Sequence, residues 1–330
     1  MPGSSYPADF DIDLARAGQI VRLATSGIEP SNPRSLIAHL PRLACRLLGG
    51  YDDVVEPTHL AWARLYDASR LIDQVQDGHL DDFGEAGTTL NVAVALFFAA
   101  AEPIGQLPVS TQARWFTLLR ETVTGQFEER VKSRPRLAEA LAVAEKKTGA
   151  FLGLGCWAGG VCALPPSVGS SQMDSLEALL TFGRAYGALL QIHDDLGWLE
   201  SLPQTAQPGA EPFTNIVLAA AWELEAAERH GALEQSVLDL AQSGSDAGER
   251  LRHHLVTLGV RVLCAAQAHR YRRLALAALD TIPVSDPQAN AWLRGLVETA
   301  ASAFRMTRQD GSGAGSSAGH MRDATTSEGP

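Results

Sequence analysis

Hydrophobic residues recur along most of the chain at intervals of three and four, the spacing of one face of an α-helix. The interval is clear in the segments 65–75 and 179–190. No sustained alternation of hydrophobic and polar residues, bounded by hairpin turns, competes with it. The pattern therefore predicts an all-α fold.

Clusters of glycine, proline and serine divide this helical pattern into segments with short connections. They lie at 49–50, 84–87, 103–108, 133–135, 165–166, 203–212, 243–245 and 283–287. We find no repeat with a period of about 20 to 50 residues, which disfavours a solenoid. The simplest architecture is one helical domain over residues 12–308, large enough to enclose a central cavity. Residues 1–11 and the Gly/Ser-rich tail 309–330 are predicted to be disordered, because they bury too little to offset the entropy of ordering.

Composition narrows the classes of function. The formal net charge of −11 argues against a nucleic-acid-binding protein, so a polyanionic ligand would have to bind together with cations. The four cysteines lie in apolar segments without metal-ligand spacing, as reduced cytoplasmic thiols do. The N-terminus lacks a signal-peptide pattern, and the longest apolar run, 90–101, is too short to span a bilayer. We therefore expect a cytoplasmic protein without a transmembrane segment.

A first acidic segment carries Asp73, Asp77 and Asp81 at intervals of four residues. On a helix these carboxylates would project from nearly one stripe and repel one another by about 0.2 to 0.5 kcal/mol per pair, unless a cation lies between them. The simpler interpretation is a solvated acidic face in which Arg70 pairs with Asp73.

A second acidic pair, Asp194 and Asp195, ends an almost uninterrupted apolar segment that begins at Leu179. A helix this apolar is largely buried, and buried carboxylates need partners or a metal ion. Gln191 lies one turn earlier and is placed to hydrogen-bond either a carboxylate or a metal-bound water. The alternative is a helix end that emerges into solvent.

Lys147 and Thr148 precede a strongly apolar segment that contains several glycines. An ammonium group at the rim of an apolar cavity suits a diphosphate oxygen. The alternative is an ordinary charged start of a helix.

The order and spacing of these segments resemble the trans-isoprenyl diphosphate synthase (polyprenyl synthetase) family over residues 30–308. The matching motifs are Asp73 to Asp77, Gly125–Gln126, Lys147–Thr148 and Gln191 to Asp195. The resemblance implies an isoprenoid synthase-type bundle with a central active-site cavity, forming a homodimer. It also implies that Asp73, Asp77 and Asp194 bind Mg²⁺, three ions with bound diphosphate, that Asp195 and Lys147 join them in catalysis, and that Lys147, Thr148 and Gln191 contact the substrate.

Chain-elongating members of the family also bind isopentenyl diphosphate, and the residues for that substrate are missing here. The segment 32–39 lacks the expected lysine and arginine-proline pair, Tyr66 replaces a histidine, and Asp82 and Phe83 replace two arginines. A second diphosphate would meet repulsion on the order of 1 kcal/mol per like-charged pair even in water. We therefore expect that this site is lost.

Three departures affect the allylic site itself, where Gln74 and Trp198 replace aspartates and Pro212 replaces a lysine. Trp198 and Tyr66 are candidate substrate contacts, since an aromatic face stabilises a carbocation, although Trp198 fits equally well as a core residue. Arg270 and Tyr271 resemble the arginine-tyrosine pair with which terpene cyclases hold the departing diphosphate. The run of basic residues around them also fits a solvated helix face.

An enzyme that ionises an allylic diphosphate but excludes a second one must capture its cation differently. We therefore predict a class I terpene cyclase, a lyase that ionises a linear allylic diphosphate with the help of Mg²⁺. One alternative is a prenyltransferase with an acceptor other than isopentenyl diphosphate. The other is a non-catalytic subunit that modulates a competent synthase.

Overall fold

The computed structural model describes residues 33–77, 85–131, 134–165, 169–205, 215–225, 230–243, 245–302 and 304. Throughout these residues the regular structure is helical, which confirms the all-α prediction. The termini predicted to be disordered lie outside the described residues. The helices are α2 (Pro33–Ala38), α3 (Leu40–Leu47), α4 (Asp52–Asp77), α5 (Ala86–Gly105), α6 (Val109–Val131), α7 (Leu137–Ala144), the π-helix η1 (Glu145–Gly149), α8 (Ala150–Ala163), α9 (Ser170–Thr205), α10 (Ile216–Leu224), α11 (His230–Ser243), α12 (Ser245–Leu258), α13 (Val260–Asp280) and α14 (Pro287–Ser302).

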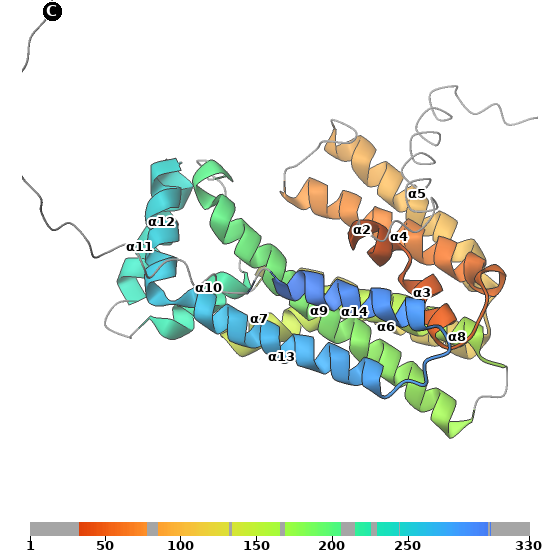
Figure 1. The fold of residues 1–330 in the computed structure, drawn as a ribbon. Helices are drawn as coiled ribbons and strands as arrows, with labels where there is room; N and C mark the ends of the chain where they lie inside the picture. The colour runs from red at the N-terminus through yellow and green to blue at the C-terminus, as the bar shows by residue number, and fades with distance from the viewer. Residues whose placement is uncertain are drawn as a thin grey trace, which may run out of the picture.

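The long helix α9 runs through the whole bundle and organises it (Figure 1). Helices α8 and α13 pack along α9, and α12 packs against it at the end where α11 and α12 gather. Helices α4 and α5 lie side by side as a separate pair, which α8 and α3 join to the rest. The arrangement places the C-terminal end of α4 and the C-terminal part of α9 on one side of the molecule.

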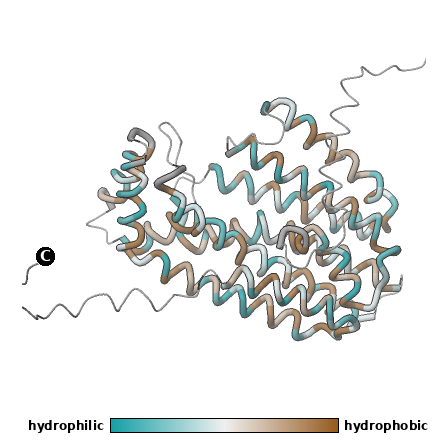
Figure 2. Tube along the Cα trace, turned by 45° about the horizontal axis from the view of Figure 1, so that its top comes forward, coloured by the Kyte–Doolittle hydropathy of each residue, from teal (hydrophilic) through white to brown (hydrophobic). Residues whose placement is uncertain are grey.

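The core is built from alanine and leucine around a few large aromatic side chains. Trp62, Trp115, Phe182, Tyr186 and Tyr271 are almost completely buried. Figure 2 shows hydrophobic and hydrophilic residues alternating along nearly every helix, as expected when each helix buries one face. A second, smaller cluster lies between α4 and α5 and consists of Ala68, Leu71, Val92, Ala93 and Leu96.

Glycines allow η1 and α8 to lie directly on α9. A Cβ atom at Gly183 would be 2.5 Å from the Cα of Gly153, and one at Gly187 would be 2.7 Å from the Cα of Gly149. These distances are shorter than any real Cβ contact, so the backbones meet only because side chains are absent. The crossing brings the Lys147–Thr148 segment against the α9 acidic motif.

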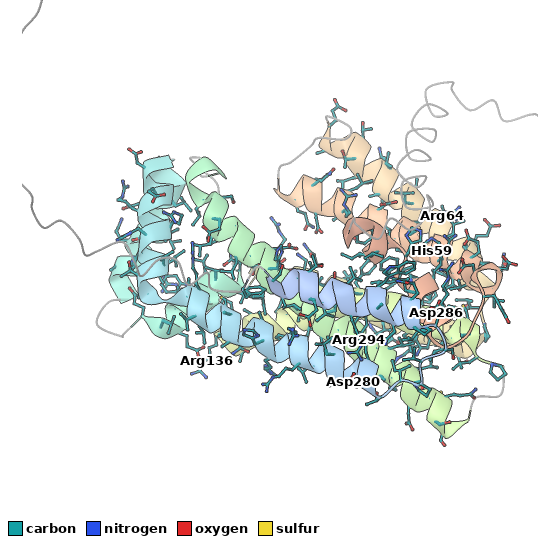
Figure 3. The ribbon with its side chains drawn as sticks, in the orientation of Figure 1. His59, Arg64, Arg136, Asp280, Asp286 and Arg294 are labelled. Atoms are coloured by element: carbon teal, nitrogen blue, oxygen red, sulfur yellow. The ribbon has the colours of Figure 1, made fainter. Side chains whose placement is uncertain are left out.

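Several helix boundaries differ from the sequence prediction, for example the unpredicted break between α10 and α11. Helix α9 continues to Thr205, past the expected break at Pro203. Helices α12 and α13 are separated at Gly259, whose φ of +86° lies in the left-handed region that glycine favours. Side chains stabilise the connection between α13 and α14. Asp286 accepts hydrogen bonds from backbone N–H groups in the first turn of α14, and Arg294 pairs with Asp280 (Figure 3).

Helix α5 bears on the expectation of a protein without a transmembrane segment. Among the described helices, α5 alone is long and apolar enough to cross a bilayer by length and composition, and 33% of that stretch is buried. The apolar stretch of α5 is therefore longer than the run 90–101. A core helix passes the same test, so the finding is weak evidence for a membrane span.

Candidate active site

The structure brings the motif residues from three helical segments together around Lys147. Asp73 lies near the C-terminal end of α4, Lys147 lies in η1, and Asp195 lies in α9. The charges of Asp73 and Asp195 both act on the Lys147 ammonium group. The side chain of Asp77, the second predicted ligand of α4, lies outside the described residues, as does Asp81.

The sequence suggested that Lys147 and Thr148 begin a helix. In the structure they lie instead in the π-helix η1, which joins α7 to α8 without interruption. The backbone N–H of Ala150 donates to the carbonyl oxygen of Glu145, five residues earlier. On the other side of η1, a Cβ atom at Gly125 of α6 would lie 2.5 Å from the backbone nitrogen of Lys147. The π-helix is thus held between α6 and α9, and π-helical turns often occur at functional sites.

Two carboxylates of α6 pair with the two lysines of η1. Lys146 Nζ donates to Glu128 Oε1 at 2.8 Å, and Lys147 Nζ donates to Glu129 Oε2 at 2.7 Å. Burial alone would lower the pKa of Lys147, but Glu129 and Asp73 raise it above its ordinary value. Lys147 is therefore a charged ammonium group in a partly buried site.

A chain of hydrogen bonds links η1 to α9 and α10. Thr148 Oγ1 donates to Gln191 Oε1 at 2.9 Å, and Gln191 Nε2 donates to Asp195 Oδ1 at 2.9 Å. The second oxygen of Asp195 accepts a hydrogen bond of 2.7 Å from the backbone N–H of Ile216, the first residue of α10. This confirms that Gln191 holds a carboxylate, and it fixes the orientation of its amide.

Asp194 and Asp195 have different environments although they are neighbours. Asp195 is buried, and burial raises the pKa of its carboxyl group to about 7, against the lowering effect of its two hydrogen bonds. Asp194 has 62% of its side chain exposed and lies 3.3 Å from His193 Nδ1, which raises the pKa of His193. Only Asp194 of this pair is available to an incoming cation, because both oxygens of Asp195 are already engaged.

Mg²⁺ prefers carboxylate oxygens, a few from the protein and the rest from water and phosphate. Asp194 and the partly buried Asp73 fit this requirement, and Asp195 does not. Among the side chains that the structure describes, no three His, Cys, Asp or Glu residues gather as a ready metal site. The full predicted set includes Asp77, so the three-ligand site stays a prediction.

Aromatic side chains fill the interior between α4 and α8. The ring of Tyr66 stacks on Trp62 at 5.4 Å between centroids and faces Phe151 at 6.4 Å. Tyr186 of α9 is buried, and burial together with Tyr66 and Asp194 raises its pKa. Trp198 packs on the core as a partly buried residue, which favours its structural interpretation.

Arg270 and Tyr271 lie on a different side of η1 from Lys147. The buried Tyr271 hydroxyl donates to Glu145 Oε1 at 2.6 Å, and Arg270 lies 5.2 Å from the Tyr271 ring centre. Both line a groove between α7 and α13 that shares no residue with the cavity beside Asp195. The role at the diphosphate that the sequence suggested for this pair therefore has no support in the geometry.

The cavity beside Asp195 is small. It is bordered by Gln191, Asn215 and Ile216 together with Glu128 and Glu129, and its volume of about 20 Å³ suits a single water molecule. A diphosphate does not fit there. A ligand has to bind outside this cavity, where Asp194 is exposed.

Solved structures provide a comparison for the whole arrangement. A polyprenyl synthase from Caulobacter crescentus, complexed with calcium and isoprenyl diphosphate, is 20% identical with a TM-score of 0.70, and the match covers 91% of this chain and 99% of that one. A decaprenyl diphosphate synthase from Rhodobacter capsulatus is 20% identical with a TM-score of 0.65, covering 90% and 98% of the two chains. This chain has the polyprenyl synthase fold. No family model matches the sequence, and no curated protein matches it.

The shared fold confirms, at the level of architecture, the resemblance seen in the motifs. Sequence reasoning missed three residues of the site, namely Gln76, Glu129 and Glu145. Gln76 accepts a hydrogen bond of 2.6 Å from Gln126. Glu129 lies four residues after Gly125, on the next turn of α6, and this spacing was its available signal. Of the positions expected for a second diphosphate, Ile37 and Ala38 are buried, and Asp82 and Phe83 lie outside the described residues.

Proposed function

We propose that this protein is a Mg²⁺-dependent enzyme that binds an allylic prenyl diphosphate beside Lys147 and ionises it, as prenyltransferases do, and that it uses an acceptor other than isopentenyl diphosphate. The observation that carries the proposal is the setting of Lys147. Its ammonium group is largely buried and charged, and the charges of carboxylates from both α4 and α9 act on it.

Lys147 has the capacity to bind phosphate oxygens. An ammonium group has three N–H donors, and Glu129 takes one of them, which leaves two for a ligand. Its attachment to Glu129 and the neighbouring Thr148–Gln191 bond hold the group in place before the ligand arrives. Preorganised charge of this kind is worth most in a partly buried site.

Asp73, Asp77 and Asp194 would hold the Mg²⁺ ions between the protein and the diphosphate. When bound, these ions neutralise the charge that develops on the departing diphosphate. In the protein itself, Asp195 keeps Gln191 and the start of α10 in position, while the aromatic side chains at Trp62, Tyr66 and Phe151 exclude water from the allylic chain.

The comparisons support the transferase class over the cyclase predicted from the sequence, because the similar structures are prenyl diphosphate synthases. The Caulobacter enzyme is complexed with calcium and isoprenyl diphosphate, as is a geranylgeranyl pyrophosphate synthase from Corynebacterium glutamicum, which supports a divalent cation here. Cyclisation stays the second candidate. Tyr66 favours it, because it is the partly buried ring of the stack with Trp62 and Phe151 and an aromatic face stabilises a carbocation in an apolar site.

The test incubates the protein with Mg²⁺ and geranyl, farnesyl or geranylgeranyl diphosphate, each with and without isopentenyl diphosphate or an aromatic acceptor. Released diphosphate and extracted products are measured. We expect diphosphate release that Asp194→Ala and Lys147→Met abolish, without lengthening of the prenyl chain.

The products separate the alternatives. A cyclic hydrocarbon formed without an acceptor identifies a cyclase, and a longer prenyl diphosphate contradicts the loss of the second diphosphate site. If no substrate is turned over and the protein tolerates Asp194→Ala, the protein is instead the non-catalytic subunit that modulates a competent synthase.

We also propose a homodimer formed through the exposed apolar faces of α5 and α6. Leu90, Val94 and Phe98 recur every four residues on α5 and are 40%, 49% and 75% exposed, and Phe116, Val123 and Phe127 are exposed on α6. Apolar patches of this kind usually mark contact sites. Light scattering of the wild type and of Phe98→Asp tests this, and a monomeric wild type contradicts it.

A further inference from the structure

Each residue of the π-helix is held by a different neighbour. Lys146 and Lys147 pair with carboxylates of α6, and Thr148 bonds to Gln191 of α9. Glu145, the first residue of η1, points the other way and accepts the hydrogen bond from Tyr271 of α13. The π-helix therefore has contacts to α6, α9 and α13 at once.

The contact between Glu145 and Tyr271 is short, partly buried and long-range. The O···O distance is 2.6 Å, the two residues are 126 positions apart, and Tyr271 is 2% exposed. A hydroxyl that donates to a carboxylate forms one of the stronger hydrogen bonds in proteins. A phenylalanine at this position would leave the carboxylate oxygen without its donor.

The position of Glu145 matters because of the kind of helix it begins. A π-turn places one more residue in a turn than an α-helix does, so the residues after it are rotated about the helix axis. If the turn relaxed to α-helical spacing, Lys147 and Thr148 would move away from Glu129 and Gln191. The glycine contacts at Gly125 and Gly187 hold the backbone of η1 but make no contact with the side chain of Glu145.

We infer that Tyr271 is a positioning residue for the proposed active site: by holding Glu145 it keeps η1 in the π-helical register that places Lys147 and Thr148. The inference rests on the proposed function of Lys147. It gives Tyr271 a role other than diphosphate binding, since its hydroxyl is bonded to Glu145 and acts on Lys147 through the backbone of η1.

The experiment compares Tyr271→Phe with two other variants. Glu145→Gln keeps an oxygen acceptor for the tyrosine and should behave within about threefold of the wild type. Tyr51→Phe is the matched control, because Tyr51 is 77% exposed and loses the same hydroxyl without a buried partner. Hydrogen exchange of the backbone amides at 146–150 reports on η1 directly, and calorimetric titration of inorganic pyrophosphate with Mg²⁺ reports on Lys147.

We expect amide exchange at 146–150 to become about tenfold faster in Tyr271→Phe, as the loss of one strong hydrogen bond allows, with exchange in α11 unchanged. Pyrophosphate binding should weaken several-fold. In a Lys147→Met background, Tyr271→Phe should cause no further loss, because both substitutions act on the same contact. If Tyr271 had a purely structural role, Tyr271→Phe would lower stability without showing this coupling to Lys147→Met.

The outcomes separate the inference from the proposed function. If Lys147→Met weakens pyrophosphate binding but Tyr271→Phe does not, the inference is overturned and the proposed function stands. If the wild type binds no pyrophosphate, the proposed function fails, and the exchange data alone decide whether Tyr271 holds η1. Unchanged exchange at 146–150 overturns the inference in every case.

Discussion

Replacing Gly125 by alanine tests the packing that places Lys147. The new Cβ atom would lie 2.5 Å from the Lys147 nitrogen and 2.9 Å from the Lys146 carbonyl carbon, and both are backbone atoms that cannot rotate away. Ordinary contact begins at 3.4 Å, so α6 and η1 would have to separate by about 0.9 Å. Insertion of a methyl group into such a contact costs about 1 to 3 kcal/mol.

The matched control is Gly295→Ala in α14, where the new methyl group meets nothing within 4 Å. Removal of a glycine from an exposed helix position stabilises it by about 0.5 to 1 kcal/mol. Gly125 also lies inside a helix, so this gain is common to both variants, and we expect them to differ by the packing cost of about 1 to 3 kcal/mol in the free energy of unfolding, measured by urea denaturation.

The same displacement should affect catalysis more than stability. A shift of nearly 1 Å in a positioned group costs up to about 100-fold in rate. The rate of diphosphate release should therefore fall in Gly125→Ala under conditions in which the variant is fully folded. Equal stability of Gly125→Ala and Gly295→Ala, with an unchanged rate, would refute the close contact between α6 and η1.

Three further substitutions or conditions give distinct results. Asp195→Ala leaves the N–H groups of Gln191 and Ile216 without their acceptor and should lower the free energy of unfolding by about 2 to 5 kcal/mol. Asp195→Asn keeps one acceptor oxygen and should cost less than half of that. Equal losses in the two variants would contradict these hydrogen bonds. Burial raises the pKa of Asp195 from 3.8 to about 7, so folding favours the protonated carboxyl group. Its contribution to stability is therefore largest below pH 4 and is lost as the pH rises through 7. In metal-free protein, the difference in the free energy of unfolding between the wild type and Asp195→Asn should change in that window. Gly259→Ala should destabilise the protein by about 1 to 2 kcal/mol in thermal unfolding, because φ is +86° and no atom lies within 4 Å to repay the strain.

The helices followed from the sequence because each buries one face, which imposes a period that a single sequence displays. The residues at which the helices end were harder to predict. Pro203 lies near the C-terminal end of α9, where the helix is already stabilised by the hydrogen bonds and packing of the residues before it. Gly259 stands alone, without the proline or serine neighbours that mark the other breaks, so its left-handed conformation was not visible.

The identity of the site residues followed from motif order, but their roles did not. Asp194 and Asp195 are adjacent letters, yet a rotation of about 100° between neighbouring helix positions exposes one and buries the other. Thr148 and Gln191 are 43 residues apart, and their contact depends on how α9 crosses η1. Such crossings are set by packing, and the glycines that permit this one carry no chemical signature.

Tyr271 shows the limit of analogy between motifs. An arginine-tyrosine pair near the C-terminus fitted a diphosphate-binding role by resemblance alone. In the structure the tyrosine bonds to Glu145 on the far side of the π-helix. The π-turn that decides this direction needs one inserted residue within a helix, and the spacing of hydrophobic residues does not reveal it.

The most direct test of the central claim is the release of diphosphate from geranyl, farnesyl and geranylgeranyl diphosphate in the presence of Mg²⁺, compared between the wild type and Asp194→Ala. Asp194 is exposed and has no structural hydrogen bond other than its contact with His193, so its loss should leave the fold intact. We predict release from at least one substrate, and we predict that both the substitution and the removal of Mg²⁺ abolish it. Release that is equal in the two proteins, or absent with all three substrates, would contradict it.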